Sequence, residues 1–160
     1  MGFKLLIVYL QCNHNCNYYK RAMTTLQKHL INHGVKPSQQ RMVILKYLMG
    51  NKSHPTADMI YNDLYKDMPT LSKTTVYNTL RLLSESGVIT AINIEEKNVR
   101  YDADLSPHAH FRCKGCGKIY DIPLDKSNSI YLDGIGELKL EEVHLYYKGQ
   151  CKECAEKGKN

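Results

Sequence analysis

The chain has 160 residues, which is enough for one domain or two small ones with a hydrophobic core. Apolar residues make up 42% of the sequence and charged residues 24%, an ordinary globular mix that argues against wholesale disorder. No apolar run reaches about 18 residues, so the sequence predicts no transmembrane helix and no membrane partner. The apolar stretch near the start is too short for a secretory signal, and we expect a cytoplasmic protein.

The formal net charge of +6 is unevenly distributed. Residues 1–22 carry three basic and no acidic residues, residues 23–103 carry ten basic and seven acidic ones, and residues 104–160 carry nine of each. The excess in the first two-thirds of the chain indicates an acidic partner, and nucleic acid is the leading candidate. A solvated basic surface without a partner explains the charge equally well.

Residues 1–22 form an extension with no clear periodicity, which we interpret as a disordered arm or the product of a mistaken start site. The extension contains Cys12, His14 and Cys16, which are metal-ligand types, but no second ligand pair lies nearby in the sequence.

Residues 23–101 show the pattern of several short helices followed by a hairpin. The first helix is expected from Thr24 to His33, with Gly34 as its stop. Three further helices are predicted from capping residues and apolar stripes: Ser38 to about Met49, a helix capped by Thr56 with Ala57, Ile60 and Leu64 on one face, and a helix capped by Ser72 with Val76, Leu80 and Leu83 as its stripe. Strands are predicted at Val88–Ile94 and Val99–Tyr101. This order predicts a winged helix-turn-helix domain.

Residues 102–160 show short strand patterns instead. Strands are predicted at Ala109–Arg112, Ile119–Ile122 and Val143–Tyr147, with a helical or irregular segment between Asp125 and Gly136. The sequence therefore predicts the α+β class, with an N-terminal winged helix-turn-helix domain and a C-terminal α/β domain that holds a four-cysteine zinc site.

Two C-x2-C pairs are the strongest chemical signal: Cys113 with Cys116, and Cys151 with Cys154. Each pair places two thiolates on a tight turn, and four thiolates around one ion are typical of structural zinc. The 34 residues between the pairs mean that the ion would hold a whole subdomain together. Redox-active pairs and an iron–sulfur cluster are the alternatives.

A second signal is His108-Ala-His110. Two histidines two positions apart on a strand point to the same face and can bind one ion together, although two surface histidines are an equal alternative. Asp102 and Asp121 lie on either side of the pair. A mixed nitrogen and oxygen donor set suits Fe²⁺, Mn²⁺ or Zn²⁺.

The helix capped by Ser72 presents polar, basic and aromatic side chains opposite its apolar stripe. Such a face is typical of a recognition helix in the major groove, whereas a solvated helix face is the alternative. The residues that we expect to contact DNA are Lys36, Arg41, Lys73, Thr74, Thr75, Tyr77, Asn78 and Arg81.

Several motifs together resemble the ferric uptake regulator family. They are His54-Pro-Thr-Ala-Asp58, Thr75-Val-Tyr-Asn-Thr-Leu80, Glu85-Ser-Gly87, Arg100-Tyr-Asp102, His108-Ala-His110 and the segment from Cys113 to Asp121. The resemblance runs from about residue 23 to residue 156. It implies a homodimeric, metal-dependent repressor that binds operator DNA and is not an enzyme. The absence of a Gly-rich phosphate loop, a nucleophile elbow and an H-E-x-x-H motif agrees with this.

Within that family the chain is most similar to the peroxide-sensing branch. Iron-sensing members usually carry Glu where Asp102 and Asp121 stand, and tend to carry Arg where Asn78 stands. The resemblance implies a regulatory Fe²⁺ or Mn²⁺ site made of His54, Asp102, His108, His110 and Asp121. It also implies that hydrogen peroxide, the only small-molecule signal expected, oxidises His54 or His108. An iron- or zinc-responsive uptake regulator is the alternative, and a thiol redox protein is a remote one.

Two departures from the family pattern affect local geometry. Pro37 is shifted relative to the common pattern, and Gly134 and Gly136 weaken the helix expected between the last strands.

Overall fold

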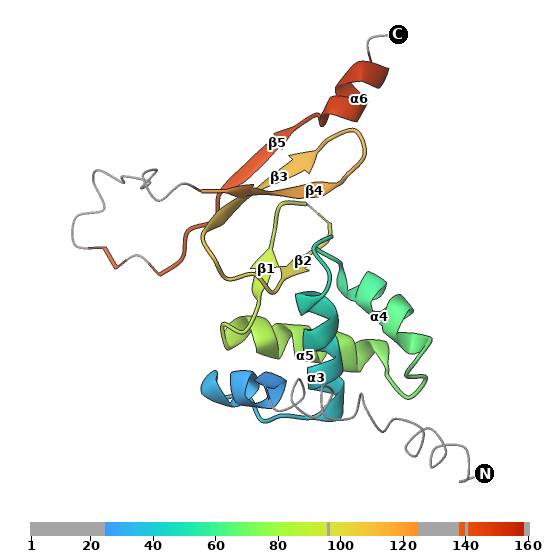
Figure 1. Cartoon of the computed structure of the whole chain (residues 1–160), viewed down its shortest axis with the longest axis vertical. Helices are drawn as coiled ribbons and strands as arrows, with labels where there is room; N and C mark the ends of the chain where they lie inside the picture. The colour runs from blue at the N-terminus through green and yellow to red at the C-terminus, as the bar shows by residue number, and fades with distance from the viewer. Residues whose placement is uncertain (1–24, 96, 125–137, 140, 159–160) are drawn as a thin grey trace, which may run out of the picture.

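The computed structural model describes residues 25–95, 97–124, 138–139 and 141–158. The predicted extension with Cys12, His14 and Cys16 and the segment from Asp125 to Gly136 lie outside the described residues. The described chain combines helices with two small sheets, which confirms the α+β class (Figure 1). Within it, no helix is long and apolar enough to cross a membrane.

The N-terminal part is built from helices whose starts follow the predicted caps. A helical segment at 25–32 precedes α3 (Gln39–Met49), α4 (Ala57–Tyr65) and α5 (Lys73–Glu85). The hydroxyls of Ser38, Thr56 and Ser72 each accept a hydrogen bond from a backbone N–H in the first turn, which satisfies a donor that the helix leaves free. The apolar faces meet in one core, and the predicted stripe on α5 is fully buried there.

A two-stranded antiparallel hairpin follows α5. Its strands are β1 (Thr90–Ile92) and β2 (Arg100–Asp102). β1 begins two residues later than the predicted strand because the backbone N–H groups of Val88 and Ile89 donate to the carbonyl of Leu83 and close α5 behind Gly87, whose φ is +67°. It also ends two residues earlier, at Ile92. The order of helices followed by a hairpin is the order that the sequence predicted.

The C-terminal part is a three-stranded sheet in the order β4-β3-β5, made of β3 (His108–Cys113), β4 (Ile119–Pro123) and β5 (Tyr146–Gly149). β5 lies later in the sequence than the predicted strand. Its position is set by parallel pairing with β3, which extends to the partners Cys113 and Gly149. The following helix α6 (Lys152–Lys157) was not predicted.

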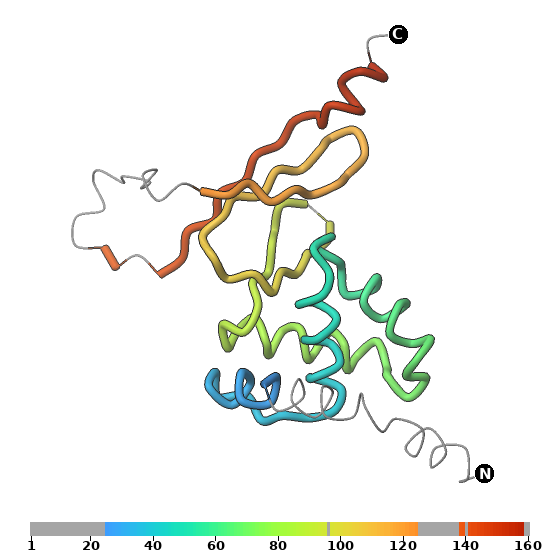
Figure 2. The backbone as a smooth tube through the Cα atoms, viewed as in Figure 1, coloured from blue at the N-terminus to red at the C-terminus, as the bar shows by residue number. Residues whose placement is uncertain are grey.

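The hairpin lies between the helices and the three-stranded sheet (Figure 2). Ile92 and Ile94 pack with Ile119 and Tyr146 in a small second cluster, which joins the two parts. The division into domains at 23–101 and 102–160 stays a prediction, and Asp102, the first residue after the boundary, ends β2.

Candidate metal centres and nucleic-acid interface

The structure brings the four predicted cysteines to one point at the end of the three-stranded sheet. Their sulfur atoms all lie within 4.8 Å of one another, and none of the four forms a disulfide. One pair comes from the last residue of β3 and the turn after it, and the other from the N-cap and first turn of α6. Because all four thiols converge, the geometry favours one tetrahedral ion over two separate redox pairs.

Gly115 is needed in this cluster for steric reasons. A Cβ at this position would lie 2.8 Å from the sulfur of Cys154 and 2.9 Å from its Cβ. A neighbouring residue, Gly117, has a φ of +72°, which other residues rarely adopt. The two glycines therefore let the first turn approach the second cysteine pair closely.

The cysteine cluster is electrostatically suited to a cation. Backbone N–H groups of Cys116 and Cys151 lower the pKa of Cys113 to about 6, and the N–H of Cys151 lies 3.2 Å from the Cys113 sulfur. Hydrogen bonding to Cys151 and Cys113 raises the pKa of Cys154 to about 12. The surroundings thus favour the thiolate of Cys113 and disfavour that of Cys154, and a cation such as Zn²⁺, which suits four thiolates, would offset the second effect.

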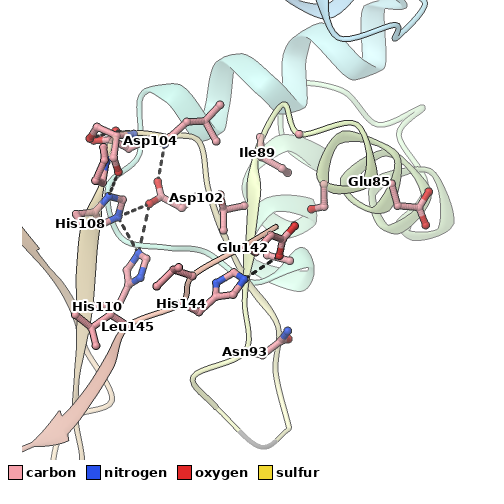
Figure 3. A pocket seen from close by; sticks show the side chains of 18 residues that line it. Glu85, Ile89, Asn93, Asp102, Asp104, His108, His110, Glu142, His144 and Leu145 are labelled. Atoms are coloured by element: carbon pink, nitrogen blue, oxygen red, sulfur yellow. Dashed lines mark hydrogen bonds and ion pairs between the residues drawn. The ribbon is translucent and has the colours of Figure 1, made fainter. Parts of the chain in front are cut away.

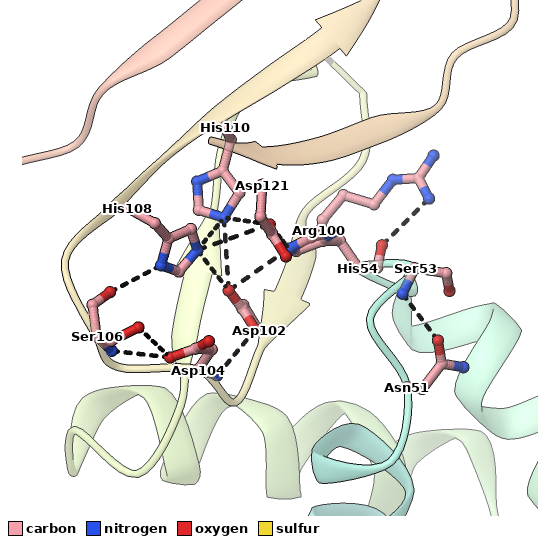
Figure 4. Close-up of polar contacts among 10 residues, drawn as sticks. All are labelled: Asn51, Ser53, His54, Arg100, Asp102, Asp104, Ser106, His108, His110 and Asp121. Atoms are coloured by element: carbon pink, nitrogen blue, oxygen red, sulfur yellow. Dashed lines mark hydrogen bonds and ion pairs between the residues drawn. The ribbon is translucent and has the colours of Figure 1, made fainter. Parts of the chain in front are cut away.

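A second group, which we call the histidine–aspartate cluster, consists of His54, Asp102, His108, His110 and Asp121. One ligand atom from each lies within 4.8 Å of all the others. The five residues come from the segment before α4, from β2, from β3 and from β4, and Figure 4 shows them pointing toward one another.

The short distances in this cluster join atoms that can each serve as a metal ligand. The Nε2 atoms of His108 and His110 are 3.0 Å apart, and Oδ2 of Asp102 lies 3.0 Å from the first and 3.5 Å from the second. His110 and Asp121 are direct partners across β3 and β4. Three nitrogens and two carboxylate oxygens form a donor set that fits Fe²⁺, Mn²⁺ or Zn²⁺.

His54 provides the test of whether a metal fits. Its side chain is 1% exposed, yet neither ring nitrogen has an aligned hydrogen-bond partner in the described structure, although Nε2 lies 2.8 Å from Oδ1 of Asp121. Its φ of +51° is also unusual for a residue with a side chain. A buried imidazole without an aligned hydrogen bond is costly, and a metal ion at the centre of the cluster would give Nε2 of His54 a partner.

The surroundings orient the other ligands. Nδ1 of His108 donates to the carbonyl of Ser106 at 2.7 Å, because a carbonyl only accepts, and this leaves Nε2 free as a ligand. Burial would raise the pKa of Asp102, but the neighbouring imidazoles of His110 and His54 outweigh it and hold that pKa well below its ordinary value. The carboxylate is therefore ionised, as a metal ligand must be.

A cavity of about 650 Å³ lies beside this cluster, with openings to solvent (Figure 3). Asp102, His108 and His110 form part of its wall. His54 is not among the lining residues. The cavity therefore gives solutes access to the cluster on the side of the β3 histidines, and Asp121, whose side chain is 33% exposed, lies outside the cavity lining.

Most of the residues predicted to contact DNA lie on the exposed side of α5. Lys73, Thr74, Tyr77, Asn78 and Arg81 are exposed, and Thr75 is half-buried.

The two other predicted contacts lie near the start of α3. Lys36 is exposed and Arg41 is half-buried. Arg41 lines a hollow of about 200 Å³ together with Thr75 and Asn78 of α5. The structure thus joins both groups of predicted residues along one surface.

Asp58 is a residue of this surface that the sequence patterns did not identify as functional. Its carboxylate lies 2.9 Å from Nζ of Lys73 and accepts a hydrogen bond from the hydroxyl of Tyr77 at 3.3 Å. The Lys73 ammonium holds the pKa of Asp58 below its ordinary value. Asp58 appeared only as part of a family motif, and nothing in the spacing indicated that it meets α5.

Comparisons with known proteins agree with these features. The model of the ferric uptake regulator family matches residues 32–147. The peroxide-responsive repressor PerR of Staphylococcus aureus (strain USA300) is 34% identical over 126 residues, which covers 78% of this chain and 85% of that protein.

Solved structures show the same fold. The ferric uptake regulator of Helicobacter pylori aligns with a TM-score of 0.65 at 22% identity, covering 85% of this chain and 93% of that one. The peroxide stress regulator of Campylobacter jejuni aligns with a TM-score of 0.58 at 28% identity, covering 82% of this chain and 98% of that one.

Proposed function

The chain belongs to the ferric uptake regulator family, whose members are transcriptional regulators rather than enzymes, and we propose that it is a metal-dependent repressor that senses hydrogen peroxide. The observation that carries the proposal is the histidine–aspartate cluster, in which a strained, unpartnered histidine faces two carboxylates and two further histidines. The similarity to the peroxide-responsive repressor of S. aureus supports the peroxide signal.

The two clusters would hold different ions. We assign Zn²⁺ to Cys113, Cys116, Cys151 and Cys154, where it is structural, because thiolates suit zinc. We assign Fe²⁺ or Mn²⁺ to the histidine–aspartate cluster, because mixed nitrogen and oxygen donors suit these ions.

The residues of the second cluster link the helical part to the sheet. His54 precedes α4, whereas His108, His110 and Asp121 lie in the three-stranded sheet and Asp102 ends the hairpin. When all five bind one ion, only one orientation of the two parts is compatible with the ligand geometry. Metal binding would therefore favour the orientation that suits DNA, as differential affinity for two states requires.

The exposed face of α5 would enter the major groove of operator DNA. Tyr77, Asn78 and Arg81 offer an aromatic edge, an amide and a guanidinium, and Lys36 and Arg41 lie where they would contact phosphates. We propose that the protein acts as a homodimer in the cytoplasm, with the C-terminal sheet domain as the dimerisation part, so that two such faces read two half-sites.

Peroxide would act on the histidines of the same cluster. An Fe²⁺ held by the cluster would activate hydrogen peroxide toward the neighbouring imidazole of His54 or His108. One peroxide oxygen would be inserted into a ring C–H bond to give 2-oxo-histidine, a poor ligand, and the other would leave as water. His108 also lines the cavity that leads to the cluster. Loss of a ligand releases the constraint on the two parts and lowers the affinity for DNA.

The test compares Fe²⁺-loaded and Mn²⁺-loaded protein before and after peroxide. We expect the Fe²⁺ form alone to lose DNA binding and to gain the mass of one oxygen atom on a peptide that contains His54 or His108. DNA binding that follows iron or zinc concentration and ignores peroxide would contradict the peroxide signal and indicate an uptake regulator instead.

A further inference from the structure

A nearly enclosed group of three charged side chains lies beside the histidine–aspartate cluster. We call it the Glu95 triad, and it consists of Glu95, Arg100 and Arg112. The exposed fractions of the three side chains are 8%, 17% and 29%. Oε1 of Glu95 accepts hydrogen bonds from Nη2 and Nε of Arg100 at 2.8 and 3.1 Å and from Nε of Arg112 at 3.3 Å.

The triad connects the hairpin to the three-stranded sheet. Glu95 follows β1, Arg100 begins β2 and Arg112 lies in β3. Since side chains alternate along a strand, Arg112 is on the same face of β3 as His108 and His110. One carboxylate therefore bonds both the hairpin and the strand that carries two of the proposed metal ligands.

Arg100 also contacts the segment that holds His54. Its Nη1 donates to the carbonyl oxygen of His54 at 3.2 Å, as Figure 4 shows. The backbone of the same strand supports this contact, because the N–H of Tyr101 donates to the carbonyl of Pro55 at 3.1 Å and Thr56 forms a bridge with Arg100. These bonds restrain a residue whose φ of +51° needs support from its surroundings.

We propose that Glu95 is a positioning residue of the regulatory metal site, which acts through Arg100 on His54 and through Arg112 on β3. The inference rests on the proposed function, because it takes the histidine–aspartate cluster to be that site. By joining the three segments, Glu95 assembles the cluster before the metal binds, so less of the metal's binding energy goes into ordering the ligands. Without Glu95, the two guanidinium groups would lose the carboxylate that they share and would repel each other.

The test is a Mn²⁺ titration of the zinc-loaded full chain. We expect Glu95→Gln to weaken Mn²⁺ binding by about 10- to 100-fold, the usual effect of removing a group that orients ligands. Glu95→Asp keeps the charge but is too short to reach both guanidinium groups, and it should also weaken binding. If Glu95 acted only through electrostatic attraction to the ion, Glu95→Asp would bind Mn²⁺ as tightly as the wild type. Glu85→Gln, the same change on α5, is the matched control and should bind Mn²⁺ normally.

Zinc content and thermal unfolding show whether each variant is folded. Arg112→Lys keeps the charge and removes only the guanidinium link between Glu95 and β3. It replaces Glu95→Gln as the test variant if Glu95→Gln does not fold. We expect it to weaken Mn²⁺ binding by about 3- to 10-fold. Mn²⁺ affinities within about twofold of the wild type in the folded variants would overturn the inference alone. A wild-type chain that binds no Mn²⁺ beyond its zinc would overturn the proposed function and the inference with it.

Discussion

The cysteine cluster and the histidine–aspartate cluster differ in their donor atoms and in the chain segments that supply them. The cysteine cluster uses one donor type from two short C-x2-C motifs, and both motifs lie at the same end of one sheet. The histidine–aspartate cluster uses two donor types from segments of the helical part, the hairpin and the sheet. An ion in the first cluster therefore stabilises the part that surrounds it, whereas an ion in the second fixes one part relative to the other. This is the difference that we expect between the proposed structural site and the proposed regulatory site.

The largest expected effect follows from the loss of a cysteine ligand. In Cys113→Ser, we expect zinc to be lost and the melting temperature to fall by about 10–20 °C, because the binding energy of structural zinc is also folding energy. Cys113 is fully buried, so the sheet loses a central support as well. Zinc analysis and thermal unfolding check this. A zinc-free variant as stable as the wild type would contradict a structural role for the cluster.

Loss of a ligand from the histidine–aspartate cluster should have a different outcome from loss of a cysteine. His54→Ala should weaken Mn²⁺ binding by at least about 100-fold, because a ligand matters at least as much as its supporting residues. The zinc content should stay the same. DNA binding of the Mn²⁺-loaded protein should be lost, which a gel-shift titration measures. If DNA binding persists without the second ion, that ion does not set the orientation of the two parts.

Gly115→Ala tests the close approach of the two cysteine motifs. The new Cβ would lie 2.8 Å from the Cys154 sulfur, and we expect a loss of about 1–3 kcal/mol in unfolding free energy, as in other overpacked sites. Gly50→Ala is the control, because its nearest new contact is an ordinary 3.6 Å. Chemical denaturation of the zinc-loaded proteins gives the comparison, and equal losses in both variants would exclude a special role for Gly115.

The smallest effect is expected at Asp58, away from both clusters. Asp58→Asn removes the partner of Lys73 and frees that ammonium for a phosphate. The log–log slope of DNA affinity against salt should then steepen by about 1, since each neutralised phosphate contributes about 0.9. Binding to unrelated DNA should rise more than binding to the operator. Asp67→Asn, the same change beyond the other end of α4, should leave the slope unaltered. An unchanged slope in Asp58→Asn would mean that Lys73 does not reach the DNA.

Much of the local structure could be predicted from short patterns. The caps at Ser38, Thr56 and Ser72 and the buried stripe on α5 were correct, because capping and helical periodicity act over a few residues. The strand predicted at Ala109–Arg112 was also confirmed, and in the structure it extends by one residue at each end, to His108 and Cys113. The end of α5 was less predictable, since Val88 and Ile89 are typical strand residues that instead close the helix.

The position of β5 and the presence of α6 could not be predicted in the same way. β5 pairs in parallel with β3, and its register depends on a partner that lies far back in the sequence. The first residues of the strand predicted at Val143–Tyr147 do not pair with β3. The pairing instead continues to Gly149, which brings the second cysteine pair close to the first.

The sequence by itself determined the donor atoms and their local spacing: two C-x2-C pairs, a His-x-His pair on a strand, and a capped helix with one polar face. Only the tertiary structure decided which of these meet. It placed His54 in a strained, buried position opposite β3, bonded Glu95 to two arginines, and set Asp58 against Lys73. The physical reason is that spacing acts through a few bonds of chain, whereas these contacts depend on how the helices, hairpin and sheet pack together.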